Sequence, residues 1–366
     1  MMSKIISLVT GFHCRFFCFL CCVGLVFSGG DNILLGTEES VSPPFIEITR
    51  PGTQHISAFV TSFAFSPDGE KIVVADASGG VRVWDAVSGK ELQGLSTPGG
   101  DFYANPANFN GSVGSVVFSP DGKKIVAGGS DRTVRIWDAE SGEALRRWET
   151  EAGMIYSVAV SPDGEKIIVG GGRIRVLNID SGRPLPGWRT HTHTHTGGIL
   201  SVSVSPDGKK IVTSGSGPDF STIIWDFESG RELRRLEWHT PVPNLASFSP
   251  DGKTIVTSAF RIIGGLDHGY FVRIWDSETG KELRKLEGHT ASVRHASFSS
   301  DGTKIVTGGN DRSVRIWEAE SGKEMQKLDV PMAIVNRVGF SPDGRKVIAA
   351  MRDSYRDYVV RIWTLE

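Results

Sequence analysis

The stretch that decides the fold is residues 113–148, VGSVVF-SPDG-KKIVAGGS-DRTVRIWD-AESGEALRRW. It contains short runs rich in valine, isoleucine and aromatic residues, a composition that favours β-strands; these runs are 113–118, 124–128, 133–137 and 144–148. The turn at 119–122 suits a tight hairpin, because proline fixes φ and glycine accepts positive φ. Short strands joined by tight turns predict one antiparallel sheet.

This unit recurs seven times along the chain. Each copy ends its first run in Ser-Pro-Asp-Gly or, once, in Ser-Ser-Asp-Gly, and the closing glycines are Gly69, Gly122, Gly164, Gly208, Gly252, Gly302 and Gly344. One sheet cannot bury both of its faces, so the copies must stack and the stack must close. The sequence therefore predicts an all-β fold: a seven-bladed β-propeller of four-stranded antiparallel blades over residues 45–366.

Closure of the ring needs a strand from outside the last repeat. That repeat ends just after its third run, 359–363, and lacks a fourth. Before the first repeat lies an unassigned strand-like run, Phe-Ile-Glu-Ile-Thr-Arg at 45–50. We predict that this N-terminal run pairs with 359–363 as the outer strand of the seventh blade, which leaves no unpaired interface in the ring.

The motifs of the repeats resemble the WD40 family. Val-Arg-Ile-Trp-Asp stands at 134–138 and 272–276, a close variant stands at 314–318, and Gly-His-Thr stands at 288–290. The resemblance covers roughly residues 45–366 and implies a propeller that works as a non-catalytic binding scaffold. The resemblance is specific for the fold and nearly silent on the partner. We expect a protein or peptide partner, no cofactor or metal, and a monomer.

The resemblance also implies a buried hydrogen-bonded network of His, Ser or Thr, Asp and Trp in a blade. Two repeats keep all members: His289, Thr307, Asp311 and Trp317 in the sixth, and His195, Thr213, Asp219 and Trp225 in the fourth. The other repeats depart from the pattern. The third has Leu177 in place of the Trp and a shortened turn, so we expect it to be the weakest blade.

The N-terminal segment reads as an export signal. Lys4 and Arg15 precede an uncharged apolar stretch, 16–27, and small residues follow at 28–30. The stretch is shorter than the roughly 20 residues of a membrane span. We expect residues 1–30 to be a signal peptide or anchor and 31–44 a linker. The protein would then be exported, secreted or periplasmic; a misassigned start codon would instead make it cytoplasmic.

The charge balance argues against nucleic acid as a partner, and the cysteine positions argue against a disulfide in the propeller. Lys and Arg total 40 and Asp and Glu total 42, so the chain lacks the basic excess that nucleic-acid binding calls for. No membrane contact is expected beyond the N-terminal anchor. The four cysteines are Cys14, Cys18, Cys21 and Cys22, so no disulfide holds the predicted propeller together.

Two residue patterns could carry chemistry, and each has a structural alternative. His191, His193 and His195 alternate with threonine. In an extended strand they would stand about 7 Å apart, too wide for one metal unless the loop curls, so a polar loop and a zinc or nickel site stay open as interpretations.

An arginine also recurs two places before the third-strand Trp, and we predict that it pairs with nearby acids rather than lining an anionic groove; the set is Arg82, Arg135, Arg175, Arg273, Arg315 and Arg361.

The repeats also predict which end of the ring binds. We call the strands of a blade a, b, c and d; the a–b and c–d turns lie at one end and are nearly uniform. The irregular insertions fall in b–c and d–a connections: 96–110, 190–197, 260–271 and 351–357. They carry aromatic and arginine residues suited to a protein interface: Phe102, Tyr103, Phe260, Arg261, Tyr270, Arg352, Tyr355 and Arg356.

The alternative function is an exported propeller enzyme with a metal-dependent site at the central channel. The first strands of the repeats carry few acids or histidines; His295 is an exception, and the cation Arg294 precedes it. The repeats are also too alike to show the unlike converging residues that catalysis needs. We therefore favour the scaffold.

Overall fold

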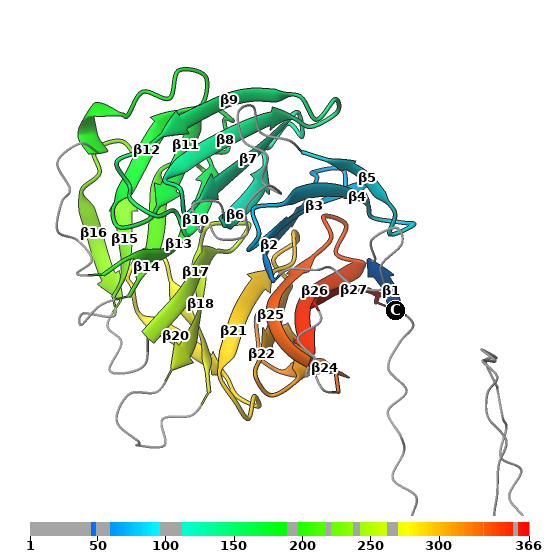
Figure 1. Cartoon of the computed structure of the whole chain (residues 1–366). Helices are drawn as coiled ribbons and strands as arrows, with labels where there is room; N and C mark the ends of the chain where they lie inside the picture. Colours follow the sequence, from blue (N-terminus) through cyan, green and yellow to red (C-terminus); the bar gives the residue numbers. More distant parts are fainter. Residues whose placement is uncertain are drawn as a thin grey trace, which may run out of the picture. The chain divides into compact units, whose positions relative to one another are not determined.

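The computed structural model describes residues 45–48, 59–95, 112–188, 197–216, 221–236, 242–261, 270–331, 333–353 and 358–365. The predicted export signal and linker lie outside these residues. A compact unit spans Ser42–Glu366, and its seven antiparallel sheets form a ring around a central channel (Figure 1). The seven-bladed β-propeller is confirmed. The described residues contain no helix with the length and apolar composition that a bilayer crossing requires.

Each blade is a meander that starts at the channel and runs outward. The first three blades are β2 (Val60–Phe65), β3 (Lys71–Asp76), β4 (Val81–Asp85) and β5 (Glu91–Gly94); β6 (Val113–Phe118), β7 (Lys124–Gly129), β8 (Thr133–Asp138) and β9 (Ala144–Glu149); and β10 (Ser157–Val160), β11 (Lys166–Gly170) and β12 (Ile174–Asn178). The fourth and fifth are β13 (Ile199–Val204), β14 (Lys210–Gly215), β15 (Thr222–Asp226) and β16 (Glu232–Leu236); and β17 (Val242–Phe248), β18 (Thr254–Arg261), β19 (Val272–Asp276) and β20 (Glu282–Leu286). The last two are β21 (Val293–Phe298), β22 (Lys304–Gly309), β23 (Ser313–Glu318) and β24 (Glu324–Asp329); and β25 (Ala333–Phe340), β26 (Lys346–Asp353), β27 (Tyr358–Thr364) and β1 (Phe45–Ile48).

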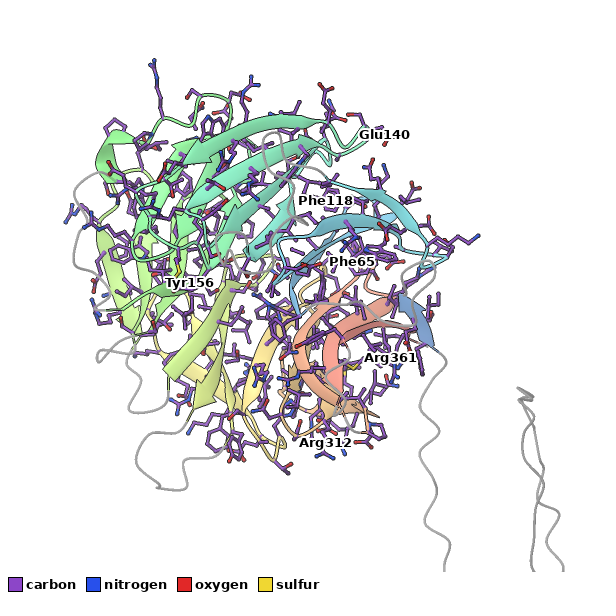
Figure 2. All side chains as sticks on the ribbon, viewed as in Figure 1. Phe65, Phe118, Glu140, Tyr156, Arg312 and Arg361 are labelled. Atoms are coloured by element: carbon purple, nitrogen blue, oxygen red, sulfur yellow. The ribbon has the colours of Figure 1, made fainter. Side chains whose placement is uncertain are left out.

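The N-terminal strand closes the ring, as predicted. β1 pairs antiparallel with β27, with Phe45 opposite Trp363 and Ile48 opposite Val360. Arg361 lies at this seam (Figure 2), with its guanidinium carbon 4.3 Å from the centroid of the Phe45 ring. The seventh blade is therefore built from both ends of the propeller.

The third blade differs from the four-stranded pattern of the other six. Within the described residues it has three strands, followed by a single bridge from Leu177 to Pro184 and the 3₁₀-helix η1 (Pro186–Trp188). Proline cannot donate to a strand ladder, which explains why no fourth strand continues through this segment. Trp188 fills the space: it is fully buried, and its Nε1–H donates to the carbonyl oxygen of Phe227, 2.8 Å away, in the next blade.

Two of the predicted irregular insertions begin as regular strand. β18 and β26 are each eight residues long, so Phe260 and Arg261 belong to β18 and Arg352 belongs to β26. The prediction placed these residues in loops because the repeat motif ends before them. The antiparallel pairing continues past the motif, and Arg352 stands opposite Ile334 on one side and Tyr358 on the other.

The core lies between neighbouring sheets. The strand-c tryptophans Trp84, Trp137, Trp225, Trp317 and Trp363 are fully buried among valine and isoleucine side chains of strands b and c. The recurrent strand-c arginines pair with acids, as predicted. The pairs are Arg82–Asp76 (3.1 Å), Arg135–Asp131, Arg175–Glu151 (3.4 Å), Arg273–Glu282 (2.9 Å), Arg315–Glu324 (2.5 Å) and Arg361–Glu47 (3.4 Å).

Candidate functional site

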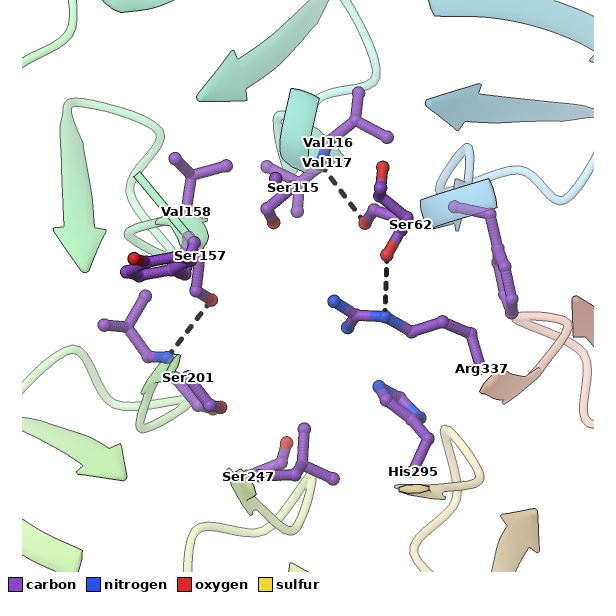
Figure 3. A pocket seen from close by; sticks show the side chains of 18 of the residues that line it. Ser62, Ser115, Val116, Val117, Ser157, Val158, Ser201, Ser247, His295 and Arg337 are labelled. Atoms are coloured by element: carbon purple, nitrogen blue, oxygen red, sulfur yellow. Dashed lines mark hydrogen bonds between the residues drawn. The ribbon is translucent and has the colours of Figure 1, made fainter. Parts of the chain in front are cut away.

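The ring is hollow at its centre, where the inner strands surround a channel. It encloses a cavity of about 750 Å³ lined by the innermost strands, β2, β6, β10, β13, β17, β21 and β25 (Figure 3). The described residues that line it include no aspartate, glutamate or lysine. Their charged or titratable side chains are Arg294, His295, Arg337 and Tyr156.

One position of each repeat, seven residues before the closing glycine, lines the channel. Its occupants around the ring are Ser62, Ser115, Ser157, Ser201, Leu245, His295 and Arg337. Three of the serines link neighbouring blades by accepting a hydrogen bond from a backbone N–H of the next one. The bonds run from Val116 to Ser62 (3.2 Å), from Val202 to Ser157 (3.2 Å) and from Ala246 to Ser201 (3.3 Å).

The preceding residue of the inner strand lies in a β-bulge in most blades. The pairing of strands a and b skips it in six blades; the skipped residues are Thr61, Gly114, Leu200, Asn244, Arg294 and Asn336. Tyr156 holds this place just before β10. A bulge redirects a side chain and ends regular pairing. The blades therefore differ most at the channel end that meets the b–c and d–a connections.

Arg337 and His295 form the charged side of the channel. Arg337 donates from Nε to the carbonyl oxygen of Thr61, 2.9 Å away in the first blade, and Figure 3 shows its guanidinium reaching into the channel above the imidazole of His295. Burial lowers the pKa of Arg337 to about 10, so it stays a cation at neutral pH. Burial and the charge of Arg337 lower the pKa of His295 to about 3, which leaves the imidazole neutral. The buried Nδ1 of His295 has no hydrogen-bond partner among the described residues.

Arg294 adds a second cation beside His295 in the sequence. Its Nε donates to Oδ1 of Asn310 at 2.5 Å, which fixes its direction. Burial lowers its pKa, and the positive charge of Arg352 acts in the same direction. The cationic side chains of the channel mouth are thus concentrated on blades six and seven.

The network that the resemblance implied takes the following form in the sixth blade. His289 Nδ1 lies 2.7 Å from Asp311 Oδ2, His289 Nε2 lies 2.7 Å from Thr307 Oγ1, and Trp317 Nε1 donates to Thr307 Oγ1 at 2.8 Å. Burial acts to raise the pKa of Asp311, but the hydrogen bond and charge of His289, together with hydrogen bonds from Ser313 and Thr290, lower that pKa to about 2.

Two other blades show one bond of this network. In the fourth blade Trp225 Nε1 donates to Thr213 Oγ1 at 2.8 Å, while His195 and Asp219 lie outside the described residues. The fifth blade has a matching pair, Trp275 to Thr257 at 2.7 Å, which the sequence analysis did not single out. These bonds fix the blade interior and lie apart from the channel.

Most of the predicted partner-binding residues lie outside the part of the chain whose side chains the structure describes. Those are Phe102, Tyr103, Phe260, Arg261, Tyr355 and Arg356. Tyr270 and Arg352 are described, and both are half-buried. The sequence analysis singled out Arg294 and His295 but missed Arg337. Counting back seven residues from each closing glycine would have found it.

The described residues include no group of three or more His, Cys, Asp or Glu side chains that could hold a metal. His191, His193 and His195 lie outside them. The metal-dependent alternative for the channel therefore has no donor set among the described lining residues.

Comparison with known proteins agrees with this architecture. The chain is 31% identical to Protein HIR1 of Yarrowia lipolytica over 102 residues, 24% of this chain and 10% of that protein. It is 28% identical to Protein ANTHESIS POMOTING FACTOR 1 of Arabidopsis thaliana over 136 residues, 36% of this chain and 38% of that protein. It is 26% identical to eukaryotic translation initiation factor 3 subunit I of Culex quinquefasciatus over 112 residues, 31% of this chain and 30% of that protein.

The chain thus spans well under half the length of these relatives. The family model "WD domain, G-beta repeat" matches four segments, residues 49–85, 104–138, 187–226 and 280–318. Each segment ends at a strand-c Trp and the acidic residue after it. The chain is therefore a seven-bladed β-propeller in which four of the repeats match the WD40 family model.

Proposed function

We propose that this propeller is a non-catalytic scaffold that binds a protein or peptide partner at the end of the ring formed by the b–c and d–a connections, the variable face. The observation that carries the proposal is the contrast between the two ends of the inner strands. One end is the same seven times, and the other differs from blade to blade.

At the uniform end, a serine and an aspartate side chain of each a–b turn hydrogen-bond within that turn. In every repeat a buried serine donates from Oγ to the turn aspartate; the donors are Ser66, Ser119, Ser161, Ser205, Ser249, Ser299 and Ser341. The same serine also accepts the N–H of the residue that starts strand b, as Ser119 does from Lys124 at 2.9 Å. Because the seven turns are nearly identical, this end presents few side-chain differences by which a partner could recognise a particular blade.

The variable face offers unlike side chains on a rigid frame. The bulged residues there range from glycine to leucine, asparagine and arginine, and they surround the mouth of the cavity. Specific recognition relies on such differences presented by loops and strand ends on a fixed scaffold. One relative is by name a subunit of a translation initiation factor, which is a role in an assembly. That name supports a binding role as a class and no particular partner.

Quantitative mass spectrometry of proteins captured by the tagged full chain from its native host tests the proposal. The variable-face variant is Tyr270→Ala with Arg352→Ala. The matched variant is Lys123→Ala with Lys209→Ala, two exposed side chains on a–b turns. Asp121 and Asp301 are unsuitable for this purpose, because each accepts hydrogen bonds that hold its turn.

We expect the variable-face variant to lose the partner that the wild type captures and the turn variant to keep it. Melting temperatures of both variants must match that of the wild type within a few degrees. Loss of the partner from the turn variant alone would show that the other face binds.

A further inference from the structure

We propose that the channel mouth between blades six and seven is a carboxylate-binding subsite, and that an acidic side chain of the partner enters it to meet Arg337. This inference rests on the proposed function, because it names the chemistry that the variable face would recognise. Three features of the site support it: the donors that Arg337 leaves unused, the absence of an acidic side chain among the described residues around it, and the charge of the surrounding wall.

Arg337 has more donors than its structural task needs. Four other blades place serine at the same position, and three of these serines make the bond that ties one blade to the next. Arg337 makes the corresponding tie with Nε alone, to Thr61 in the first blade. Its two terminal nitrogens then point into the channel (Figure 3). A guanidinium edge presents parallel N–H donors whose spacing matches the two oxygens of a carboxylate.

Arg337 also differs from the six strand-c arginines. Each of the six strand-c arginines lies against an Asp or Glu. No described residue lining the channel around Arg337 is acidic. The pKa of Arg337 is lowered by burial with no described carboxylate to raise it again. Holding a partly buried cation without an acid costs free energy, and a carboxylate from a ligand would recover part of it.

The wall around Arg337 favours an anion over a cation. Arg294, a second cation, lines the same cavity, and His295 next to it is uncharged at physiological pH. The opposite wall presents uncharged side chains, among them Ser115, Ser157 and Ser201. A cavity of about 750 Å³ is wide enough for a side chain to enter. Like charge on this wall would reject a lysine or arginine of a wrong partner.

The imidazole of His295 is a built-in reporter for the test. Burial is the larger cause of the lowered pKa of His295 and the charge of Arg337 is the second, and a carboxylate next to Arg337 would cancel that second cause. The full chain is labelled with ¹³C-histidine and titrated with N-acetyl-glutamate amide. NMR follows the ring signals of His295 during the titration. His295→Gln identifies the signals. N-acetyl-lysine amide and sodium chloride at equal ionic strength are the reference titrations.

We expect a saturable shift with the glutamate probe, none with the lysine probe, and at least about tenfold weaker binding in Arg337→Ser. Serine at this position already occurs in four blades. Lys123→Ser, which removes an exposed cation from a turn, should leave the titration unchanged. Arg337→Lys should retain part of the binding, because it keeps the charge and loses the paired donors. An unsaturable shift in the wild type, or equal binding in Arg337→Ser, would overturn the proposal. Saturation by sodium acetate but not by the glutamate probe would overturn the assigned occupant.

Partner capture separates this inference from the proposed function. One outcome is that Arg337→Ser captures the partner as well as the wild type does while Tyr270→Ala with Arg352→Ala loses it. That result would support the variable face as the binding face and contradict the carboxylate subsite. If the glutamate probe binds through Arg337 but both variants keep the partner, a carboxylate subsite exists but the partner does not occupy it, and the partner binds another face.

Discussion

Nε of Arg361 lies 3.4 Å from Oε2 of Glu47, although 314 positions separate the two residues in the chain. The pair spans the seam between β27 and β1. The same arginine lies over the ring of Phe45, and Phe45 in turn lies opposite Trp363. The seam is therefore held by side chains as well as by the strand ladder.

Removing β1 should destabilise the whole ring. Deletion of residues 1–52 takes β1 away and exposes the edge of β27, whereas deletion of 1–42 leaves β1 in place. We expect the shorter protein to melt at least about 5 °C lower, since a few kcal/mol of lost packing shift a domain of this size by that much. Thermal unfolding followed by circular dichroism measures it. Equal melting temperatures would contradict a stabilising role of the seam.

Thr307 joins the two parts of the sixth-blade network, because His289 and Trp317 both bond to its hydroxyl. Thr307→Val keeps the shape of the side chain but leaves two buried polar groups without this partner. We expect the free energy of unfolding to fall by about 2–4 kcal/mol. Chemical denaturation measures the loss. Thr364→Val, at an exposed position, is the control and should change the stability by less than about 0.5 kcal/mol.

Trp188 should stabilise the third blade as an outer strand does elsewhere. It is fully buried, its ring lies 6.2 Å from that of Trp225, and it bonds to the fourth blade. Trp188→Ala should therefore cost about 3–5 kcal/mol. Trp148→Ala, which truncates a half-buried tryptophan of the second blade, should cost clearly less. A similar loss in both variants would mean that Trp188 has no special role in this blade.

The turn aspartates predict how stability depends on pH. The pKa values of all seven are below the usual 3.8; the residues are Asp68, Asp121, Asp163, Asp207, Asp251, Asp301 and Asp343. For Asp121 the causes are the hydroxyl of Ser119 first and the backbone N–H of Lys123 second. A group whose pKa falls on folding stabilises the native state above its unfolded pKa, and this is lost as pH falls through the folded pKa.

Seven such groups should make acid unfolding steep. We expect a melting temperature that changes little between pH 7 and 5, and that drops sharply below about pH 4. Asp121→Asn with Asp301→Asn removes two of the groups and should make the drop shallower. If the double variant and the wild type lose the same number of degrees between pH 5 and 3, the turns do not set the acid limit.

We also predict export with removal of the N-terminal segment. Protein isolated from its native host should then begin near Asp31 and contain no cysteine, because the four cysteines all precede that position. Intact mass before and after alkylation measures this, and the full-length recombinant chain provides the alkylated standard. A native species that retains Cys14 to Cys22 would contradict cleavage.

The blades and the closing strand could be predicted from the sequence, because the runs and turns that form them can each be recognised locally in the chain. Strand runs, Pro-Asp-Gly turns and the missing last strand are all visible in the chain itself, and β1 pairs with β27 as expected. The third blade was harder. Pro184 and Pro186 warn against a regular fourth strand, but nothing local shows that Trp188 will reach Phe227 in the next blade.

The candidate site depends on relations between repeats. Arg337 and His295 come together because the ring places blades six and seven side by side and because a bulge directs each inner strand. A motif search finds what the repeats share, whereas this site lies where they differ. Aligning the repeats by their closing glycines brings these differences into one column, and that column reads Ser, Ser, Ser, Ser, Leu, His, Arg.

The seam also sets an order of events during synthesis. Of all the strands in the ring, β1 leaves the ribosome first and β27 last, and these two must pair. Six blades contain neighbouring segments and can form as the chain emerges, since local contacts form early. The seventh cannot be completed until translation has reached its final strand. Until then the nascent protein is an open arc, with an unsatisfied edge at each end that a chaperone or a second nascent chain could occupy.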